Sequence, residues 1–183
     1  MKKLQFLLLD AGPIIKLFEL GIWDKFVDKC EAIISQTVAN QAKRVGREFG
    51  IELDIEPYKN QGLVKIFDLE PSASKVFCDK FDLQYKAEIH PGEKETLAFL
   101  YNSNDPCIVC SADKAVFRVL GLLGRGEQGV SLEELTDKIG LQIGLNWTKV
   151  SPRDVDWWKF TKKFREVYTQ KGRVDAAQSQ GFV

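Results

Sequence analysis

The sequence lacks a net charge, a long apolar run and a dense set of cysteines. Its 26 Lys and Arg residues balance 26 Asp and Glu residues, so a polyanion would have to bind at a local patch. Four cysteines in 183 residues are not the disulfide framework of a small secreted domain. The apolar start is too short for a signal peptide, and no stretch approaches the roughly 18 apolar residues of a membrane span. These absences predict a soluble, cytoplasmic protein.

Metal-binding Cys and His residues are also scarce. Cys107 and Cys110 form a Cys-x-x-Cys pattern inside an expected strand, where positions three apart point to opposite faces of the sheet. The sequence has no second Cys pair, so we predict core cysteines. The one histidine, His90, lies three residues before Glu93. We interpret it as a surface-loop residue, with an approach to Glu93 as the alternative.

The chain alternates apolar strand-length runs with segments of helical periodicity. Strands are expected at 4–9, 31–36, 63–70 and 107–111. Helices are expected at 13–26, 37–50, 71–83, 90–104, 112–124, 131–140 and 151–168. This alternation predicts an α/β fold, with a parallel sheet of about four to five strands covered by helices on both faces. We expect one domain over 1–124, a helical extension over 125–174 that packs on it, and a disordered polar tail over 175–183.

Three carboxylates lie where this fold would bring them together. Asp10 ends the first strand, Asp113 follows the fourth, and Glu93 opens the helix before that fourth strand. Ligands of parallel sheets bind beyond the carboxyl ends of the strands. Converging carboxylates stay ionised together when a hard cation neutralises them, and Mg²⁺ or Mn²⁺ is the usual ion. Such a site can polarise a phosphoryl oxygen and activate water for in-line attack.

The order and spacing of these segments resemble those of PIN-domain ribonucleases, the fold of the toxin in VapBC-type toxin–antitoxin pairs. The resemblance covers about residues 4–124 and depends on FLLLDAGPIIKL (6–17), IISQTVANQAKR (33–44), PGEKETLAFL (91–100) and CIVCSADKAVFRVLG (107–121). It implies a three-layer α/β/α fold with Asp10, Glu93 and Asp113 as catalytic metal ligands, and Ser111 as a residue that orients a ligand. Gln41 stands where the family commonly has a further acid, and it would bind a metal-bound water.

Each of these acids also has a simpler interpretation. Asp10 and Asp113 precede helices and would serve as N-caps, which is compatible with metal binding. Glu93 in a first helical turn complements the helix macrodipole, and Glu95 is a possible substitute for it in the same motif. The joint placement of three acids at the expected positions of one fold favours a metal site.

Nucleic-acid binding requires positive charge near this edge of the sheet. The candidates adjacent to the acids in sequence are Lys16, Lys94, Lys114 and Arg118. The last helix is basic and has one aromatic stripe, formed by Trp157, Phe160, Phe164 and Tyr168. We expect this stripe to pack on the domain while the lysines face water. The alternative is that Trp158 and the lysines stack on and attract RNA, or that the stripe binds a partner.

The sequence therefore leads to one main functional hypothesis, a Mg²⁺- or Mn²⁺-dependent endoribonuclease. A further hypothesis is that this enzyme is a toxin neutralised by an antitoxin. Its partners would be an RNA substrate and an antitoxin or other protein. The resemblance also raises the hypothesis of a homodimer, because PIN-like proteins are often dimers. The alternative is a catalytically weak PIN-like module that binds nucleic acid or a protein, which the amide at Gln41 supports. Another α/β phosphohydrolase is disfavoured, because the first strand has no Asp-x-Asp and no phosphate-binding loop is present.

Overall fold

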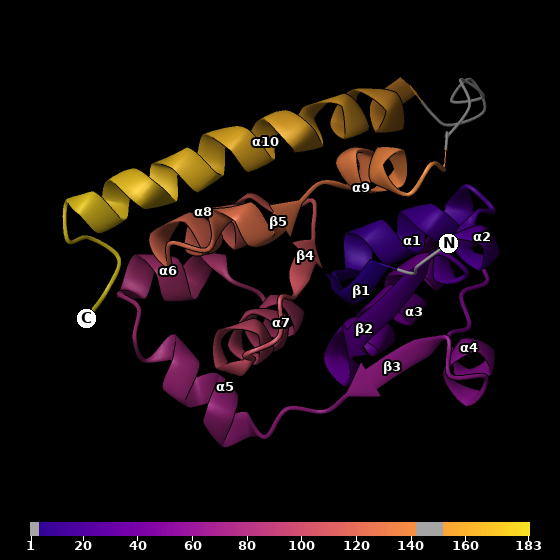
Figure 1. The fold of residues 1–183 in the computed structure, drawn as a ribbon, viewed down its shortest axis with the longest axis horizontal. Helices are drawn as coiled ribbons and strands as arrows, with labels where there is room; N and C mark the ends of the chain where they lie inside the picture. The colour runs from indigo at the N-terminus through magenta and orange to yellow at the C-terminus, as the bar shows by residue number, and fades with distance from the viewer. Residues whose placement is uncertain (1–3, 142–151) are drawn as a thin grey trace.

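The strands form one sheet in the computed structural model, which describes residues 4–141 and 152–183 (Figure 1). In these residues five strands lie in the order β3-β2-β1-β4-β5, and every neighbouring pair is parallel. They are β1 Leu4–Leu9, β2 Cys30–Ser35, β3 Val64–Phe67, β4 Ile108–Cys110 and β5 Gly129–Val130. The predicted parallel sheet is confirmed. The two-residue β5 was not predicted, because its Gly-rich sequence is typical of a link.

Helices connect the strands and account for most of the remaining chain. They are α1 Ala11–Glu19, α2 Trp23–Val27, α3 Gln36–Glu48, α4 Glu56–Asn60, α5 Pro71–Cys78, α6 Leu83–Glu88, α7 Pro91–Asn102, α8 Lys114–Leu122, the 3₁₀ helix η1 Gly126–Gln128, α9 Leu132–Lys138 and α10 Pro152–Ala177. None of the helices in the described residues is both long and apolar enough to cross a membrane.

Two expected helices are each divided in two. The helix expected over 13–26 breaks at Gly21, whose φ of 64° is left-handed and cannot continue a helix. The helix expected over 71–83 ends at Cys78, and α6 then begins with Asp82 as its N-cap, whose side chain accepts a hydrogen bond from the Tyr85 amide. Local turns therefore override the apolar periodicity in both segments.

Two apolar clusters lie on opposite faces of the sheet. Leu9 and Cys110 belong to the cluster beneath α1, α2, α3 and α9. Leu8 and Val109, their neighbours in sequence, belong to the cluster beneath α5 to α8. This alternation is what a strand covered on both faces requires, and it confirms the three-layer arrangement.

The cysteines are part of these cores. Cys107 lies in the second cluster and Cys110 in the first, so the two thiols are on opposite faces of the sheet, as predicted. All four cysteines lie in the described residues, and none of them is in a disulfide bond. Burial raises the pKa of Cys107 and of Cys110, which is typical of inert core cysteines.

The last helix is longer than predicted, since it continues to Ala177, and it lies along α8 (Figure 1). The backbones approach closely at two glycines. A Cβ added at Gly172 would lie 1.9 Å from the Arg118 carbonyl oxygen, and one added at Gly121 would lie 2.1 Å from the Thr169 carbonyl oxygen. Ser151 and the side chains of Trp157, Trp158 and Phe160 lie outside the described residues. Phe164 and Tyr168 are partly buried, and Tyr168 packs against the second apolar cluster.

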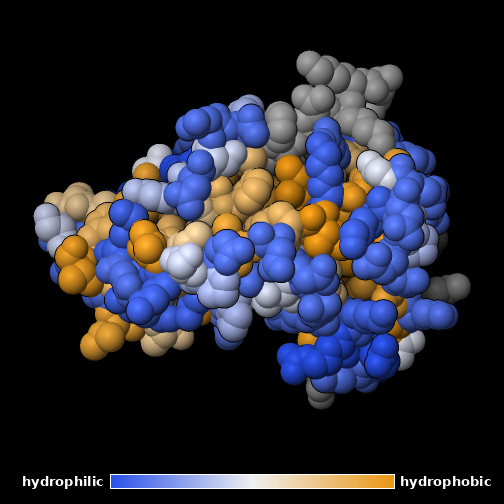
Figure 2. All heavy atoms as spheres, turned by 90° about the horizontal axis from the view of Figure 1, so that it is seen from below, coloured by the Kyte–Doolittle hydropathy of each residue, from blue (hydrophilic) through white to orange (hydrophobic). Residues whose placement is uncertain are grey.

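The segment expected to be a disordered tail has ordered contacts instead. Asp175 is buried in α10 and bonds to Arg118 and Tyr85. Farther on, Phe182 stacks on Phe81 with ring centroids 5.7 Å apart and forms a β-bridge with it. A polar composition does not reveal these partners, because they are distant in sequence. Apolar side chains gather at this end of the molecule, where Leu83 and Phe182 are exposed (Figure 2).

Candidate metal centre at the strand ends

The strand order creates a topological switch point between β1 and β4. From β1 the chain passes to β2 and β3 on one side, and later to β4 and β5 on the other. Such a switch point is where ligands bind in open parallel sheets. Asp10 follows β1 directly, and Asp113 lies three residues beyond β4. Both predicted aspartates therefore lie at the strand ends that flank this switch point.

Asp10 is a buried N-cap. Its Oδ1 accepts a hydrogen bond of 2.7 Å from the Ala11 amide, and its Oδ2 accepts one of 2.8 Å from the Ser111 hydroxyl. Burial raises the pKa of Asp10, while these two hydrogen bonds act in the opposite direction. The carboxylate is thus held in one orientation, with lone pairs on both oxygens still available.

Ser111 connects the two aspartates. Its hydroxyl donates to Asp10 and accepts a hydrogen bond of 3.0 Å from the Asp113 amide. Asp113 in turn caps α8, since its Oδ1 accepts a hydrogen bond of 2.7 Å from the Ala115 amide. Both aspartates are the helix caps that the simpler interpretation predicted, and capping fixes the orientation of each carboxylate beside the switch point.

Glu93 is held at the start of α7 by a capping box. Its Oε2 accepts a hydrogen bond of 2.8 Å from the His90 amide. Burial, and after it the negative charges of Asp10 and Asp113, raise the pKa of Glu93 to about 7. This carboxyl group therefore carries an unfavourable charge at neutral pH, which a cation beside it would relieve.

One ligand atom from each of His90, Glu93 and Asp113 lies within 4.8 Å of the others. The ring nitrogen Nδ1 of His90 lies 3.3 Å from Glu93 Oε1. Asp10 is not part of this group of three, although its charge acts on Glu93. A donor set of two carboxylates, one imidazole and a nearby third carboxylate fits a divalent cation such as Mn²⁺ or Mg²⁺.

Sequence reasoning favoured a surface-loop position for His90 and left its approach to Glu93 as the alternative. The His90 side chain is indeed largely exposed. Its ring nevertheless turns toward Glu93, because His90 is the N-cap of α7 and Glu93 occupies the third position of that helix. The capping-box spacing of three residues was the signal that could have identified it.

Two further candidate residues lie where α3 and α7 meet, Gln41 on α3 and Glu95 on α7. Gln41 contacts the start of α7, since a Cβ added at Gly92 would lie 3.2 Å from Gln41 Oε1. Glu95, the possible substitute acid, accepts a hydrogen bond of 2.6 Å from Thr37 through Oε1. Its Oε2 is enclosed and has no hydrogen-bond partner within the described part of the chain. Glu95 thus links α7 to α3, while Glu93 is the acid directed to the cluster.

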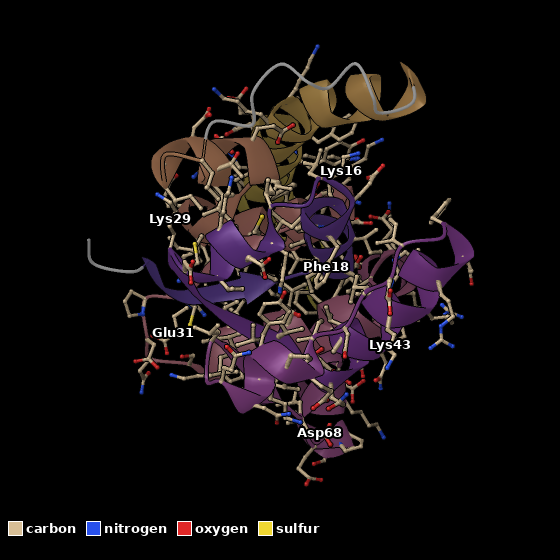
Figure 3. The ribbon with its side chains drawn as sticks, turned by 90° about the vertical axis from the view of Figure 1, so that its right-hand side faces the viewer. Lys16, Phe18, Lys29, Glu31, Lys43 and Asp68 are labelled. Atoms are coloured by element: carbon tan, nitrogen blue, oxygen red, sulfur yellow. The ribbon has the colours of Figure 1, made fainter. Side chains whose placement is uncertain are left out.

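The four basic candidates have different environments. Lys16, which Figure 3 labels on α1, is buried and forms an ion pair of 2.8 Å with Glu19. Arg118 is buried between Glu88 and Asp175. Burial and neutralisation remove both from a nucleic-acid surface, which corrects the prediction for them. Lys94 is partly buried and Lys114 is exposed.

No protein-family model matches this chain, and a search of curated proteins finds no significant match to it.

Proposed function

We propose that this protein is a divalent-cation-dependent endoribonuclease of the PIN-like type, acting at the switch point between β1 and β4. The proposal is supported mainly by one observation: Glu93 and Asp113 lie together with His90 beside the switch point of a parallel sheet, and the charge of the buried Asp10 also acts on Glu93. A carboxyl group whose pKa is raised by burial and by neighbouring charges is characteristic of catalytic sites.

Glu93 and Asp113 would hold the cation, with His90 or Asp10 completing the set. A bound Mg²⁺ or Mn²⁺ would neutralise these carboxylates, polarise a phosphoryl oxygen and activate water for in-line attack. The chain's own contribution is orientation. Ser111 fixes Asp10 and the backbone of Asp113, and the His90 amide fixes Glu93. Gln41 stands next to this group on α3 and would hydrogen-bond to water there.

The proposal is tested by calorimetric titration of Mn²⁺ into the wild type and into Asp10→Asn/Asp113→Asn, followed by cleavage of a labelled RNA. Binding and cleavage in the wild type, both lost in the double variant, would support the enzyme. Folding is checked by circular dichroism, because both aspartates cap helices and Asn retains much of a cap. A folded wild type that neither binds Mn²⁺ nor cleaves RNA, even with Mn²⁺ and RNA together, would refute it.

A catalytically weak binding module is the second candidate, and the neutral amide of Gln41 supports it. Such a module would bind RNA or a protein whether or not Asp10 and Asp113 are replaced by Asn. A toxin role is an extension of the endoribonuclease proposal, in which an antitoxin covers the acidic cluster. It predicts that a co-expressed antitoxin suppresses cleavage.

A further inference from the structure

Beside the acidic cluster lies a row of alternating aromatic rings and ammonium groups, which we call the cation–aromatic row. It consists of Phe164, Lys114, Tyr168 and Lys171. The Nζ of Lys114 lies 4.5 Å from the ring centroid of Phe164 and 5.6 Å from that of Tyr168. The Nζ of Lys171 lies 5.9 Å from the centroid of Tyr168. The row crosses from the first residue of α8 to the middle of α10.

The row adjoins the candidate metal centre directly. Lys114 follows Asp113 in sequence, so their Cα atoms are about 3.8 Å apart, and Asp113 is one of the three clustered ligands. The other three members, Phe164, Tyr168 and Lys171, follow one another at spacings of four and three residues. They therefore share one side of α10, which lies along α8 (Figure 1).

The lysines of this row differ from two arginines of α10 in their ion pairing. Arg165 pairs with Glu134 at 2.7 Å, and Arg173 pairs with Glu127 at 2.6 Å. By contrast, neither Lys114 nor Lys171 forms an ion pair in the part of the chain that the structure describes. Both lysines are exposed, and the rings beside them are partly exposed. The surface offers positive charge and π-faces together.

We propose that the cation–aromatic row binds single-stranded RNA and leads it to the carboxylates. Ammonium groups bind phosphates of the backbone, and aromatic rings stack with bases without regard to sequence, which is how single strands are generally held. The positive row compensates for the repulsion that the acidic cluster exerts on a phosphodiester. This inference rests on the proposed function, because it names the substrate class of the same site.

The first experiment measures RNA binding without catalysis. Fluorescence anisotropy of a 5′-labelled 12-nucleotide oligouridylate is recorded with the full chain in EDTA, over a series of NaCl concentrations. We expect Lys114→Gln/Lys171→Gln to bind about tenfold more weakly. We also expect its slope of log affinity against log salt to fall in magnitude by about 1.4, since each phosphate contact on a single strand contributes about 0.7. The matched control Lys75→Gln/Lys138→Gln removes the same charge from exposed sites outside the row.

A second variant tests stacking separately. Tyr168→Leu keeps apolar volume but removes the π-face, and it should weaken binding about fivefold or more. Tyr101→Leu, which removes a partly exposed ring on α7, serves as its control. Binding of a 12-base-pair RNA duplex as tight as that of the single strand would overturn the stacking arrangement.

Failure of the inference and failure of the proposed function give different results. If the cation–aromatic row binds RNA, Asp113→Asn retains its affinity for oligouridylate in EDTA, even where Mn²⁺ binding and cleavage are lost. If Lys114→Gln/Lys171→Gln binds as tightly as its control, or if the wild type does not bind the oligonucleotide, the row does not bind RNA. Cleavage by the wild type would then still support the enzyme.

Discussion

Ser111 donates a hydrogen bond of 2.8 Å to Asp10 across 101 positions of sequence, and both side chains are buried. The same hydroxyl accepts a hydrogen bond from the Asp113 amide. One small side chain thus sets the separation of two carboxylates that come from different strands. A hydroxyl does this well because it donates and accepts at once.

Replacing Ser111 by Ala should therefore disturb the candidate metal centre without removing any of its ligands. The buried Asp10 Oδ2 would lose its partner, and we expect the free energy of unfolding to fall by about 1–3 kcal/mol. Mn²⁺ affinity should fall by about tenfold, which is the lower end of the range for groups that orient metal ligands. Urea denaturation and calorimetric titration measure the two effects.

The matched control is Ser131→Ala. Ser131 is also fully buried and also caps a helix, but its hydroxyl bonds to Glu134 rather than to the cluster. It should reduce stability to a similar extent and leave Mn²⁺ affinity unchanged. Equal losses of Mn²⁺ affinity in the two variants would mean that Ser111 acts only through general stability.

The stability of the metal-free protein should depend on Glu93 and on pH. The pKa of Glu93 is raised from 4.5 to about 7 in the folded state, by burial and by the nearby aspartates. Between these pH values the folded state binds more protons than the unfolded state, so the free energy of unfolding falls as pH rises. Each pH unit in this window costs up to about 1.4 kcal/mol.

Glu93→Gln removes this titration, so its stability should exceed that of the wild type increasingly from pH 5 to pH 7 in EDTA. Thermal melts at half-unit steps of pH provide the comparison. Added Mn²⁺ should stabilise the wild type most at the upper end of the window, where Glu93 is ionised. Parallel pH profiles for wild type and Glu93→Gln would show that this carboxyl group is not perturbed.

The positions of Asp10 and Asp113 could be predicted from the sequence because they depend on local patterns. A continuous apolar strand followed by an acid fixes where the carboxylate emerges, and parallel strands bring such ends to one edge. The contact between His90 and Glu93 was within reach of the same reasoning. It required only that the capping-box spacing be applied to a histidine.

Arg118 and Asp175 show why other features could not be predicted. Arg118 is one of several bases near the acids in sequence, and nothing local distinguishes it from Lys114. Its environment is decided by Asp175, 57 positions later, in a segment whose composition resembles a disordered tail. Long-range pairing of this kind leaves no periodic signal in the sequence, so composition and spacing predicted solvent exposure for both Arg118 and Asp175.

The ion pair between Arg118 and Asp175 should contribute strongly to stability. Its Nε–Oδ2 distance is 2.8 Å, and Tyr85 donates a hydrogen bond of 2.5 Å to the same oxygen. Arg118→Leu would leave a buried carboxylate without its counter-charge, and we expect it to cost about 3–5 kcal/mol at pH 7. Arg173→Leu breaks the exposed pair between Arg173 on α10 and Glu127 in η1, and it should cost less than about 1 kcal/mol.

Lowering the pH should reduce the difference in unfolding free energy between Arg118→Leu and Arg173→Leu. Burial opposes ionisation of Asp175, but hydrogen bonds from Tyr85 and Arg118 outweigh it and lower its pKa. A lowered pKa contributes stability above the ordinary value of 3.8, and this contribution is lost as pH falls through the folded value. Urea denaturation at pH 7 and pH 3 makes the comparison. A cost of Arg118→Leu that is small at pH 7, or undiminished at pH 3, would contradict the assignment.

Gly172 should be the least replaceable residue of α10, although a glycine within a helix usually reduces stability. Alanine normally gains about 1 kcal/mol over glycine in a helix, and Gly46→Ala in α3 should be close to neutral, because its added Cβ would meet Ile51 O at 3.3 Å. At Gly172 the added Cβ would lie 1.9 Å from the Arg118 carbonyl oxygen, so α10 must move away from α8. We expect Gly172→Ala to cost about 3 kcal/mol, measured by urea denaturation.

Gly172→Ala should also weaken oligouridylate binding, because Tyr168 and Lys171 reach Lys114 only while α8 and α10 stay in contact. A Gly172→Ala protein as stable as Gly46→Ala would show that α10 is not held against α8 in this way.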